Sequence, residues 1–354
     1  MGSLELENLA WFDNFTSPKY AGCNGVLKAK IVNTRLSDII IQSFQNSVKL
    51  KNFMKISIII PTYNRPEFLA QAMESILDQT LLPDEIIIGD DSTDDITEKL
   101  VKENFIARSS VSIHYFHHKP SLRQARNVDF LIQKVSNDSL LLLHDDDLLM
   151  PECLEILKAS LIKNPEVVAS FGLQYVIDDF GQLIPGGETT INENSYRIAK
   201  NSGKVDGEWA SIIGMFPNNA FLIKSEIAKK IGYNYAEKAG DAVDFYFGYL
   251  VGKGNQFFFV NDYTSKYRHS IQSISNSSKN LFSSKLDILL KDLSRDKFAN
   301  YEIKKTIKWL MNPAITELIE RGEKKNALKW MLSTHYNVFT LKGIKRVLML
   351  MTPM

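Results

Sequence analysis

Residues 55–69 read KISIIIPTYNRPEFL, and this segment contains the first structural unit of the predicted fold. Lys55–Ile60 is a short apolar, β-branched run, which is typical of a strand covered on both faces. Pro61 ends the strand, Asn64 is a candidate helix N-cap, and Pro66 suits a first helical turn. Apolar residues then recur at helical spacing, at Leu69, Ala72, Met73, Ile76 and Leu77. The segment therefore predicts a strand, a loop and a helix.

The same unit recurs along the chain. Further strands are predicted at Glu85–Gly89, Val111–Phe116 and Ser139–Leu143, and further helices at Ile96–Phe105, at Arg123–Val135 and from Pro151. Strands that alternate with helices in this way indicate an α/β fold with a mainly parallel, doubly wound sheet.

Such a sheet places its ligand at one edge. In open α/β folds, ligands bind beyond the carboxyl ends of the strands, near a switch in strand order. The loops after the first, second and fourth predicted strands read PTYNR (61–65), DDSTDD (90–95) and HDDD (144–147). We expect these polar and acidic loops to lie together on the binding edge.

Asp145, Asp146 and Asp147 follow a run of four leucines. Adjacent carboxylates at the end of a buried strand repel one another unless a cation compensates. Mg²⁺ and Mn²⁺ prefer oxygen ligands and are often shared between carboxylates and substrate phosphates. A solvated acidic turn before the helix at Pro151 is the alternative.

Other polar residues have two interpretations each. Asp90 and Asp91 could accept hydrogen bonds from a base or ribose, or could cap a helix. Arg126 and Asn127, near the start of a helix, could contact phosphate or form a surface face. His114, His117 and His118 are expected to be surface residues at a strand end.

Asp244 and His269 are the candidates from the second half. Asp244 lies in the apolar segment GDAVDFYFGYL, where a carboxylate is costly unless it has a partner or a task. A general base needs such a partly desolvated position, whereas the alternative is a carboxylate favoured by a helix N-terminus. His269 could be a metal ligand, a phosphate contact or a surface histidine.

Composition limits the class of protein. The 354 residues are 44% hydrophobic and 23% charged with a net charge of +1, so no overall field favours nucleic acid. Cys23 and Cys153 lack disulfide or metal-ligand patterning, which fits a reducing compartment. No signal peptide pattern occurs at the start, and no apolar run approaches the roughly 20 residues needed to span a bilayer. We therefore expect a cytoplasmic protein that can lie peripherally on a membrane.

Taken together, the motifs resemble the large family of inverting glycosyltransferases with the GT-A fold, often called family two. The resemblance covers about residues 54–275 and rests on IIIPTYNR (58–65), PDEIIIGDDSTDDIT (83–97), QARN (124–127), LLLLHDDDLLMP (140–151), Asp244-Phe245 and Tyr267–His269. It implies a GT-A domain at 53–275, with a donor half at 53–152 and an acceptor half at 153–275. Residues 1–52 would be an N-terminal extension, and residues 276–354 a C-terminal helical region.

The resemblance also implies roles for residues. Pro61, Thr62, Tyr63 and Arg65 would border the nucleotide, Asp90 and Asp91 would bind the base or ribose, and Arg126 and Asn127 would lie on the nucleotide side. Asp146 would hold a divalent metal, Mn²⁺ or Mg²⁺, with Asp145 near the ribose or diphosphate. Asp244 would be the base that deprotonates an acceptor hydroxyl.

The implied reaction is transfer of a sugar from a nucleotide sugar, such as a UDP-sugar, to a saccharide or lipid-linked saccharide, in synthesis of bacterial cell-surface polysaccharide or glycoconjugate. The chain departs from the family pattern twice. His144 replaces the first aspartate of the Asp-x-Asp signature, and the loop after Gly89 lacks the glycine that usually precedes the serine.

Two other functions remain open. A nucleotidyltransferase that makes nucleotide sugars would need a glycine-rich loop after the first strand, and Pro61–Pro66 has no glycine. A non-catalytic sugar-binding or nucleotide-binding protein would not need carboxylates at both Asp146 and Asp244. The final segment, Trp330–Met354, mixes apolar and basic residues, and it could lie on an anionic membrane surface or pack as an ordinary helix.

Overall fold

The computed structural model describes residues 54–270, 279–294, 296–333 and 335–351. The chain divides into two units, Met1–Phe53 and Met54–Met354. The predicted N-terminal extension therefore lies outside the described residues.

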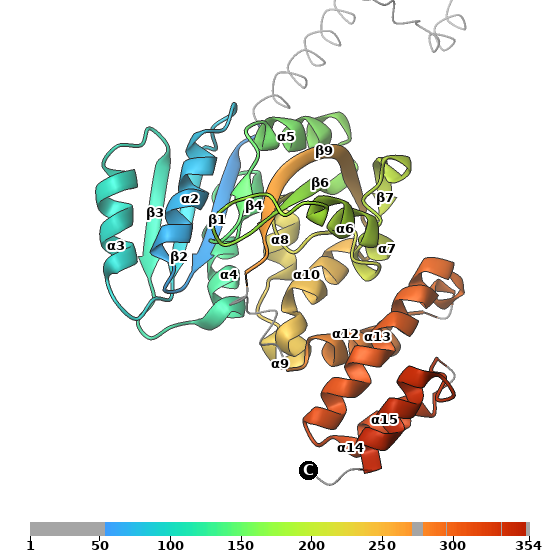
Figure 1. Cartoon of the computed structure of the whole chain (residues 1–354). Coiled ribbons are helices and arrows are strands. Elements are labelled where there is room, and N and C mark those ends of the chain that lie inside the picture. Colours follow the sequence, from blue (N-terminus) through green and yellow to red (C-terminus); the bar gives the residue numbers. More distant parts are fainter. Residues whose placement is uncertain (1–53, 271–278, 295, 334, 352–354) are drawn as a thin grey trace, which may run out of the picture. The chain divides into compact units, whose positions relative to one another are not determined.

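A nine-stranded sheet forms the centre of the second unit (Figure 1). Its strands are β1 (Ile56–Thr62), β2 (Glu85–Asp90), β3 (Ser112–His117), β4 (Ser139–Leu142), β5 (Leu148–Leu149), β6 (Val167–Ile177), β7 (Gly203–Asp206), β8 (Phe221–Lys224) and β9 (Gln256–Arg268).

The α-helices that follow these strands are α2 (Pro66–Leu77), α3 (Ile96–Leu100), α4 (Arg123–Lys134), α5 (Cys153–Lys163), α6 (Gly187–Asn194), α7 (Gly207–Ile212), α8 (Ser225–Ile231), α9 (Ala236–Ala239) and α10 (Val243–Gly252). The described residues after the sheet contain α12 (Leu281–Asp292), α13 (Tyr301–Glu320), α14 (Lys324–Met331) and α15 (Leu341–Met351). The predicted helix at Ile96–Phe105 is α3 continued by a π-helical segment, Val101–Ile106.

Strand order confirms the predicted α/β architecture and extends it. The order is β3-β2-β1-β4-β8-β6-β9-β5, with β7 paired to β9. The first four strands pair in parallel, as expected. Beyond them the sheet is mixed, because β8 runs antiparallel to both β4 and β6, and β5 and β7 run antiparallel to β9.

Strands β1, β2 and β4 are buried on both faces because their alternate residues enter two separate cores, whereas β3 at the sheet edge is only partly buried. Ile59 packs in one core with Val128 of α4. Ile58 and Ile60 pack in the other with Leu69 of α2. The first core also includes α10, α12 and α13, so the C-terminal helices are part of the same packed unit.

The strand order creates a switch point next to β1. From β1 the chain moves to β2 and β3 on one side, and it then returns to place β4 on the other side. The carboxyl ends of β1 and β4, at Thr62 and Leu142, therefore flank the position where a ligand is expected.

Candidate active site

The loops after β1 and β4 meet through Asp145. Thr62 Oγ1 donates a hydrogen bond of 2.8 Å to Asp145 Oδ2, and the Tyr63 amide lies 3.4 Å from the same oxygen. Asp145 is buried, whereas the Tyr63 side chain is exposed. The pairing of the two loops follows from the adjacency of their strands in the sheet.

Arg65, at the start of α2, is the cation nearest these carboxylates. Its Nη1 lies 2.8 Å from Asp146 Oδ2 and 3.5 Å from Asp145 Oδ1. Arg65 and Asp146 both keep some solvent exposure, so this ion pair can exchange for a ligand. The predicted residues Pro61, Thr62, Tyr63, Arg65, Asp145 and Asp146 thus belong to one cluster at the switch point.

Asp147 is held by residues from distant parts of the chain. The Arg268 amide donates to Asp147 Oδ1 at 2.6 Å, and Asn219 Nδ2 donates to Asp147 Oδ2. Asn219 Nδ2 also lies 3.2 Å from His144 Nδ1. The sequence places Asp147 in the acidic run of the candidate site, but it predicts no role for Arg268.

The Arg268 side chain connects the turn at residues 144–147, called the carboxylate turn below, to the rest of the domain. Its Nε donates to the Asp146 carbonyl at 2.7 Å, Nη1 donates to the Asp178 carbonyl at 2.7 Å, and Nη2 donates to Gln71 Oε1 at 2.8 Å. The guanidinium also lies over the Phe68 ring at 4.6 Å. Arg268 is 2% exposed. It lies in the Tyr267–His269 segment of the family resemblance, but the sequence assigned it no role.

His269 follows Arg268 directly, so its backbone lies beside the carboxylate turn. Its amide donates to the Ile177 carbonyl at 2.8 Å, and its side chain is exposed. His269 therefore lies at the same edge of the sheet as the turn at residues 144–147. Its role as a metal ligand stays a prediction.

Burial and mutual repulsion raise the pKa values of two carboxylates in the turn. Burial, and then the charge of Asp146, raise the pKa of Asp145 to about 6, against the opposing effects of Arg65 and Thr62. The same two causes raise the pKa of Asp147. A cation placed among these groups would relieve both effects.

The residues of the turn fit a divalent metal. His144, Asp146 and Asp147 each offer one ligand atom, and these atoms lie within 4.8 Å of one another. His144 Nε2 is buried without a hydrogen-bond partner among the described residues. One nitrogen and several carboxylate oxygens form a donor set that Mn²⁺ accepts.

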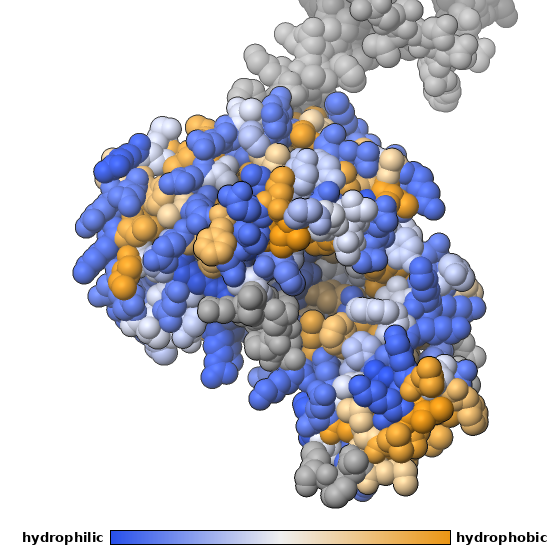
Figure 2. All heavy atoms as spheres, in the orientation of Figure 1, coloured by the Kyte–Doolittle hydropathy of each residue, from blue (hydrophilic) through white to orange (hydrophobic). Residues whose placement is uncertain are grey.

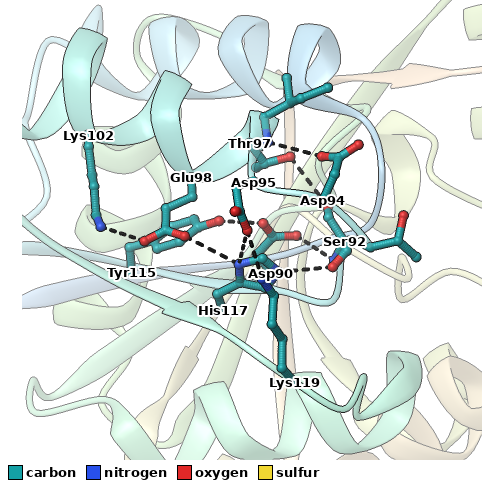
Figure 3. Close-up of polar contacts among 12 residues, drawn as sticks. Asp90, Ser92, Asp94, Asp95, Thr97, Glu98, Lys102, Tyr115, His117 and Lys119 are labelled. Carbon is teal, nitrogen blue, oxygen red and sulfur yellow. Dashed lines mark hydrogen bonds and ion pairs between the residues drawn. The ribbon is translucent and has the colours of Figure 1, made fainter.

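The loop after β2 forms a second polar cluster, shown in Figure 3. Asp90 is fully buried and accepts hydrogen bonds from the Ser92 amide, at 2.8 Å, and from the Tyr115 hydroxyl. Both of its oxygens therefore support the loop, and its contact with the nucleotide stays a prediction. Asp91 uses Oδ1 to accept from the Leu122 amide at 2.8 Å.

His117 completes this cluster, and its side chain is only 9% exposed, so the predicted surface position is wrong. Nε2 lies 2.9 Å from the Ser92 carbonyl, and Nδ1 lies 3.4 Å from Glu98 Oε2. Burial lowers the pKa of His117, but the contacts with Ser92 and Glu98 outweigh it, and the net pKa is raised.

The loops after β1 and β2 are joined at Asn64, whose φ of 53° is a left-handed conformation that asparagine tolerates. Its amide donates to Ser92 Oγ at 2.8 Å, and its Oδ1 accepts from the Thr93 amide at 3.0 Å. Asn64 therefore shapes both loops, in addition to preceding α2.

Arg126 and Asn127 face in different directions on α4. Asn127 is buried and donates from Nδ2 to the Gly89 carbonyl at 2.8 Å, at the end of β2, and its contact with the nucleotide stays a prediction. Arg126 is exposed and lines a cavity of about 310 Å³ with residues 234–238.

Asp244 lies in the first turn of α10 and is half-buried. Its Oδ1 accepts a hydrogen bond of 2.6 Å from the Tyr233 hydroxyl. Burial and the charge of Asp244 raise the pKa of Tyr233, which therefore remains a hydrogen-bond donor. The Tyr233 amide donates to Asp129 of α4 at 2.7 Å. Tyr233 therefore connects Asp244 to α4.

Comparisons with known proteins identify similar sequences and structures. The sequence model described as "Glycosyl transferase family 2" matches residues 57–232, from β1 to the residue after α8. The chain therefore contains a glycosyl transferase family 2 domain. The matched segment includes the loops after β1, β2 and β4, whereas Asp244 and Arg268 lie beyond it.

Among curated family 2 relatives, glycosyltransferase GlyG of Streptococcus pneumoniae is 24% identical over 62% of this chain and 72% of GlyG. An uncharacterized glycosyltransferase of Rickettsia bellii is 35% identical over 40% of this chain, and chondroitin synthase of Escherichia coli is 29% identical over 40%. The matches span only 19% and 20% of these two longer proteins.

Solved structures share the fold. S. aureus TarS 1–349 in complex with UDP-GlcNAc matches with a TM-score of 0.56 and 15% identity, over 83% of this chain and 89% of that one. Mannosyltransferase PcManGT from Pyrobaculum calidifontis, in complex with GDP-Man and Mn²⁺, matches with a TM-score of 0.53 and 12% identity, over 83% and 85%.

Proposed function

We propose that the protein transfers a sugar from a nucleoside-diphosphate sugar to an acceptor hydroxyl, with inversion at the anomeric carbon. The observation that carries this proposal is the convergence of the 144–147 turn with Thr62 and Arg65 at the switch point. An acidic, partly buried cluster with one arginine at this edge suits a metal and a diphosphate.

Three residues are assigned to the donor. Asp91 binds the base or ribose, because Asp90 is already bonded within the loop. Asp145 lies near the ribose or diphosphate, and Arg65 pairs with the diphosphate when the donor replaces its contact with Asp146. A UDP-sugar is the donor we favour, since TarS was crystallised with UDP-GlcNAc, although PcManGT was crystallised with GDP-Man.

A divalent metal would be held by Asp146, with His144 and Asp147 as further candidate ligands. His269 is a candidate ligand from the sequence alone, because it is not part of this group. Mn²⁺ or Mg²⁺ bound there would neutralise charge on the leaving diphosphate. Arg268 and Asn219 support the 144–147 turn by donating to the Asp146 carbonyl and to the Asp147 carboxylate, respectively.

Asp244 is assigned as the general base. Tyr233 fixes one carboxylate oxygen, which orients the other. As the acceptor oxygen forms its bond to the anomeric carbon, its proton moves to Asp244 and the bond between that carbon and the diphosphate oxygen breaks. This single displacement inverts the anomeric configuration.

The acceptor is proposed to be a saccharide or lipid-linked saccharide, in synthesis of bacterial cell-surface polysaccharide or glycoconjugate in the cytoplasm. The named relatives, GlyG and chondroitin synthase, support this class. A lipid-linked acceptor requires the enzyme to reach a membrane surface. In the described part of the chain, each helix is too short or too polar to cross a bilayer.

Release of nucleoside diphosphate tests the proposal. The protein is incubated with Mn²⁺ and a panel of UDP- and GDP-sugars, with and without saccharide acceptors. We expect Asp146→Asn and Asp244→Asn to reduce turnover at least about 100-fold. Tyr233→Phe should lower kcat less than Asp244→Asn and leave the KM for the donor unchanged.

Other products would identify other functions. Release of pyrophosphate from a nucleoside triphosphate and a sugar phosphate would indicate a nucleotidyltransferase. Binding of nucleotide sugars without any release would indicate a binding protein. Full turnover by Asp244→Asn would refute the assignment of the base.

A further inference from the structure

Helix α15 exposes an apolar face that its own packing does not use. Leu341, Ile344, Val347, Leu348 and Met351 are 88%, 49%, 38%, 60% and 76% exposed, respectively. At 100° per residue these five side chains occupy one continuous arc of the helix. We call them the α15 apolar face.

The opposite side of α15 is fixed to the protein. Gly343 is buried so close to the preceding turn that an added Cβ would lie 2.5 Å from the Val338 carbonyl. Met349 and Leu350 pack against the first core, and Arg346 Nε donates to the Asn312 carbonyl of α13 at 2.8 Å. The α15 apolar face therefore points outward because the other side is held in place.

Neighbouring residues extend the apolar surface. Leu328 of α14 and Leu332 and Phe339 of the following segment are also exposed. Figure 2 shows the apolar side chains gathered over the C-terminal helices, with strongly hydrophilic side chains beside them. Contiguous apolar surface with a polar rim marks an interaction site.

The positive charge of residues 324–354 indicates which kind of partner this surface binds. Residues 324–354 contain six basic residues and no Asp or Glu; the basic residues are Lys324, Lys325, Lys329, Lys342, Lys345 and Arg346. Since the whole chain has a net charge of +1, the remainder is net negative. A second copy of this chain would bring the same positive charge against the patch, which disfavours self-association through it.

We propose that the α15 apolar face binds the surface of an anionic lipid bilayer. The helix lies in the plane of the interface, with its apolar residues among the acyl chains and Lys342 and Lys345 at the level of the anionic headgroups. Binding itself does not depend on catalysis. Its use for reaching a lipid-linked acceptor rests on the proposed function.

Vesicle co-sedimentation of the full chain tests this proposal. We expect binding to vesicles that contain phosphatidylglycerol, weaker binding to pure phosphatidylcholine, and loss of binding at high salt. Ile344→Glu/Leu348→Glu should weaken binding at least about tenfold. Phe180→Glu, which changes an equally exposed residue elsewhere, should bind as the wild type does.

Charge is tested separately. Lys342→Glu/Lys345→Glu should weaken binding to anionic vesicles, whereas Lys291→Glu, at another exposed lysine, should not. Thermal unfolding and circular dichroism confirm that each variant is folded, and a chain truncated after residue 340 provides a second test if the glutamate variants unfold.

Two results would overturn the proposal: wild-type protein that fails to bind anionic vesicles, or wild-type protein that sediments as a dimer which Ile344→Glu/Leu348→Glu converts to monomers. Asp146→Asn should bind vesicles normally. Membrane binding and sugar transfer can therefore fail independently, which separates this proposal from the proposed function.

Discussion

The Arg268 amide donates a 2.6 Å hydrogen bond to Asp147 Oδ1, although the two residues are 121 positions apart in the sequence. This bond joins the end of β9 to the turn after β4. The Arg268 side chain then holds the Asp146 carbonyl of the same turn. The carboxylate geometry therefore depends on a residue outside the segment that matches the family.

Replacing Arg268 should affect both stability and the site. Arg268→Met removes hydrogen bonds from a buried guanidinium to three partly buried acceptors, so we expect a loss of about 2–4 kcal/mol in the free energy of unfolding. Urea unfolding measures this loss. Arg65→Gln changes a more exposed cation and should destabilise by less than about 1 kcal/mol. Equal losses of unfolding free energy for both variants would contradict the prediction that Arg268 contributes more to stability than Arg65.

The same substitution should alter the metal requirement. Because Arg268 positions Asp146 and Asp147, we expect Arg268→Met to raise the Mn²⁺ concentration needed for half-maximal activity, about 10-fold or more. Arg268→Lys should recover part of the stability but not the full metal response, since one ammonium cannot reach all three acceptors. An unchanged Mn²⁺ response in a folded Arg268→Met protein would show that Arg268 has only a structural role.

Gly89 is predicted to tolerate no side chain while Asn127 is present. An added Cβ would lie 2.0 Å from Asn127 Oδ1. Gly89→Ala should therefore destabilise the protein by about 1–3 kcal/mol. In a double-mutant cycle measured by chemical denaturation, Asn127→Ala should make Gly89→Ala less damaging than it is in the wild type. Additive effects would argue against this clash.

His117 should make stability depend on pH. Its pKa is raised in the folded state, so its contribution is fully present below the unfolded pKa of about 6.5 and is lost as the pH rises through the folded pKa. The difference in unfolding free energy between the wild type and His117→Asn should therefore be larger at low pH. His114→Asn, at the exposed histidine of the same strand, is the control. A constant difference across this pH range would refute the prediction.

The metal assignment can be separated from general damage to the site. Removal of divalent ions by a chelator should abolish turnover, and Mn²⁺ should restore it in the wild type. Asp146→Asn should not be restored at any tested Mn²⁺ concentration, whereas Asp287→Asn, at an exposed i,i+4 ion pair, should behave as the wild type. Full activity in the chelator would contradict the proposed role of Asp146.

The first half of the fold was predictable because its signals are local. The β-branched run of β1 and the helical spacing in α2 involve residues that are close in sequence. Burial on both faces makes β1, β2 and β4 largely apolar, so the polar residues at their carboxyl ends stand out. The sequence therefore determined the strand and helix order and the sheet edge that contains Thr62, Asp91 and Asp146.

The tertiary structure alone decided which polar residues of that edge are available to a ligand. Asp90 and Asp91 are adjacent, yet only the fold places the Tyr115 hydroxyl against Asp90. Asn219 and Arg268 reach Asp147 because β8 enters the sheet antiparallel beside β4 and because β9 ends next to the carboxylate turn. Such long-range pairings depend on strand order, which the local periodicity of a single sequence does not specify.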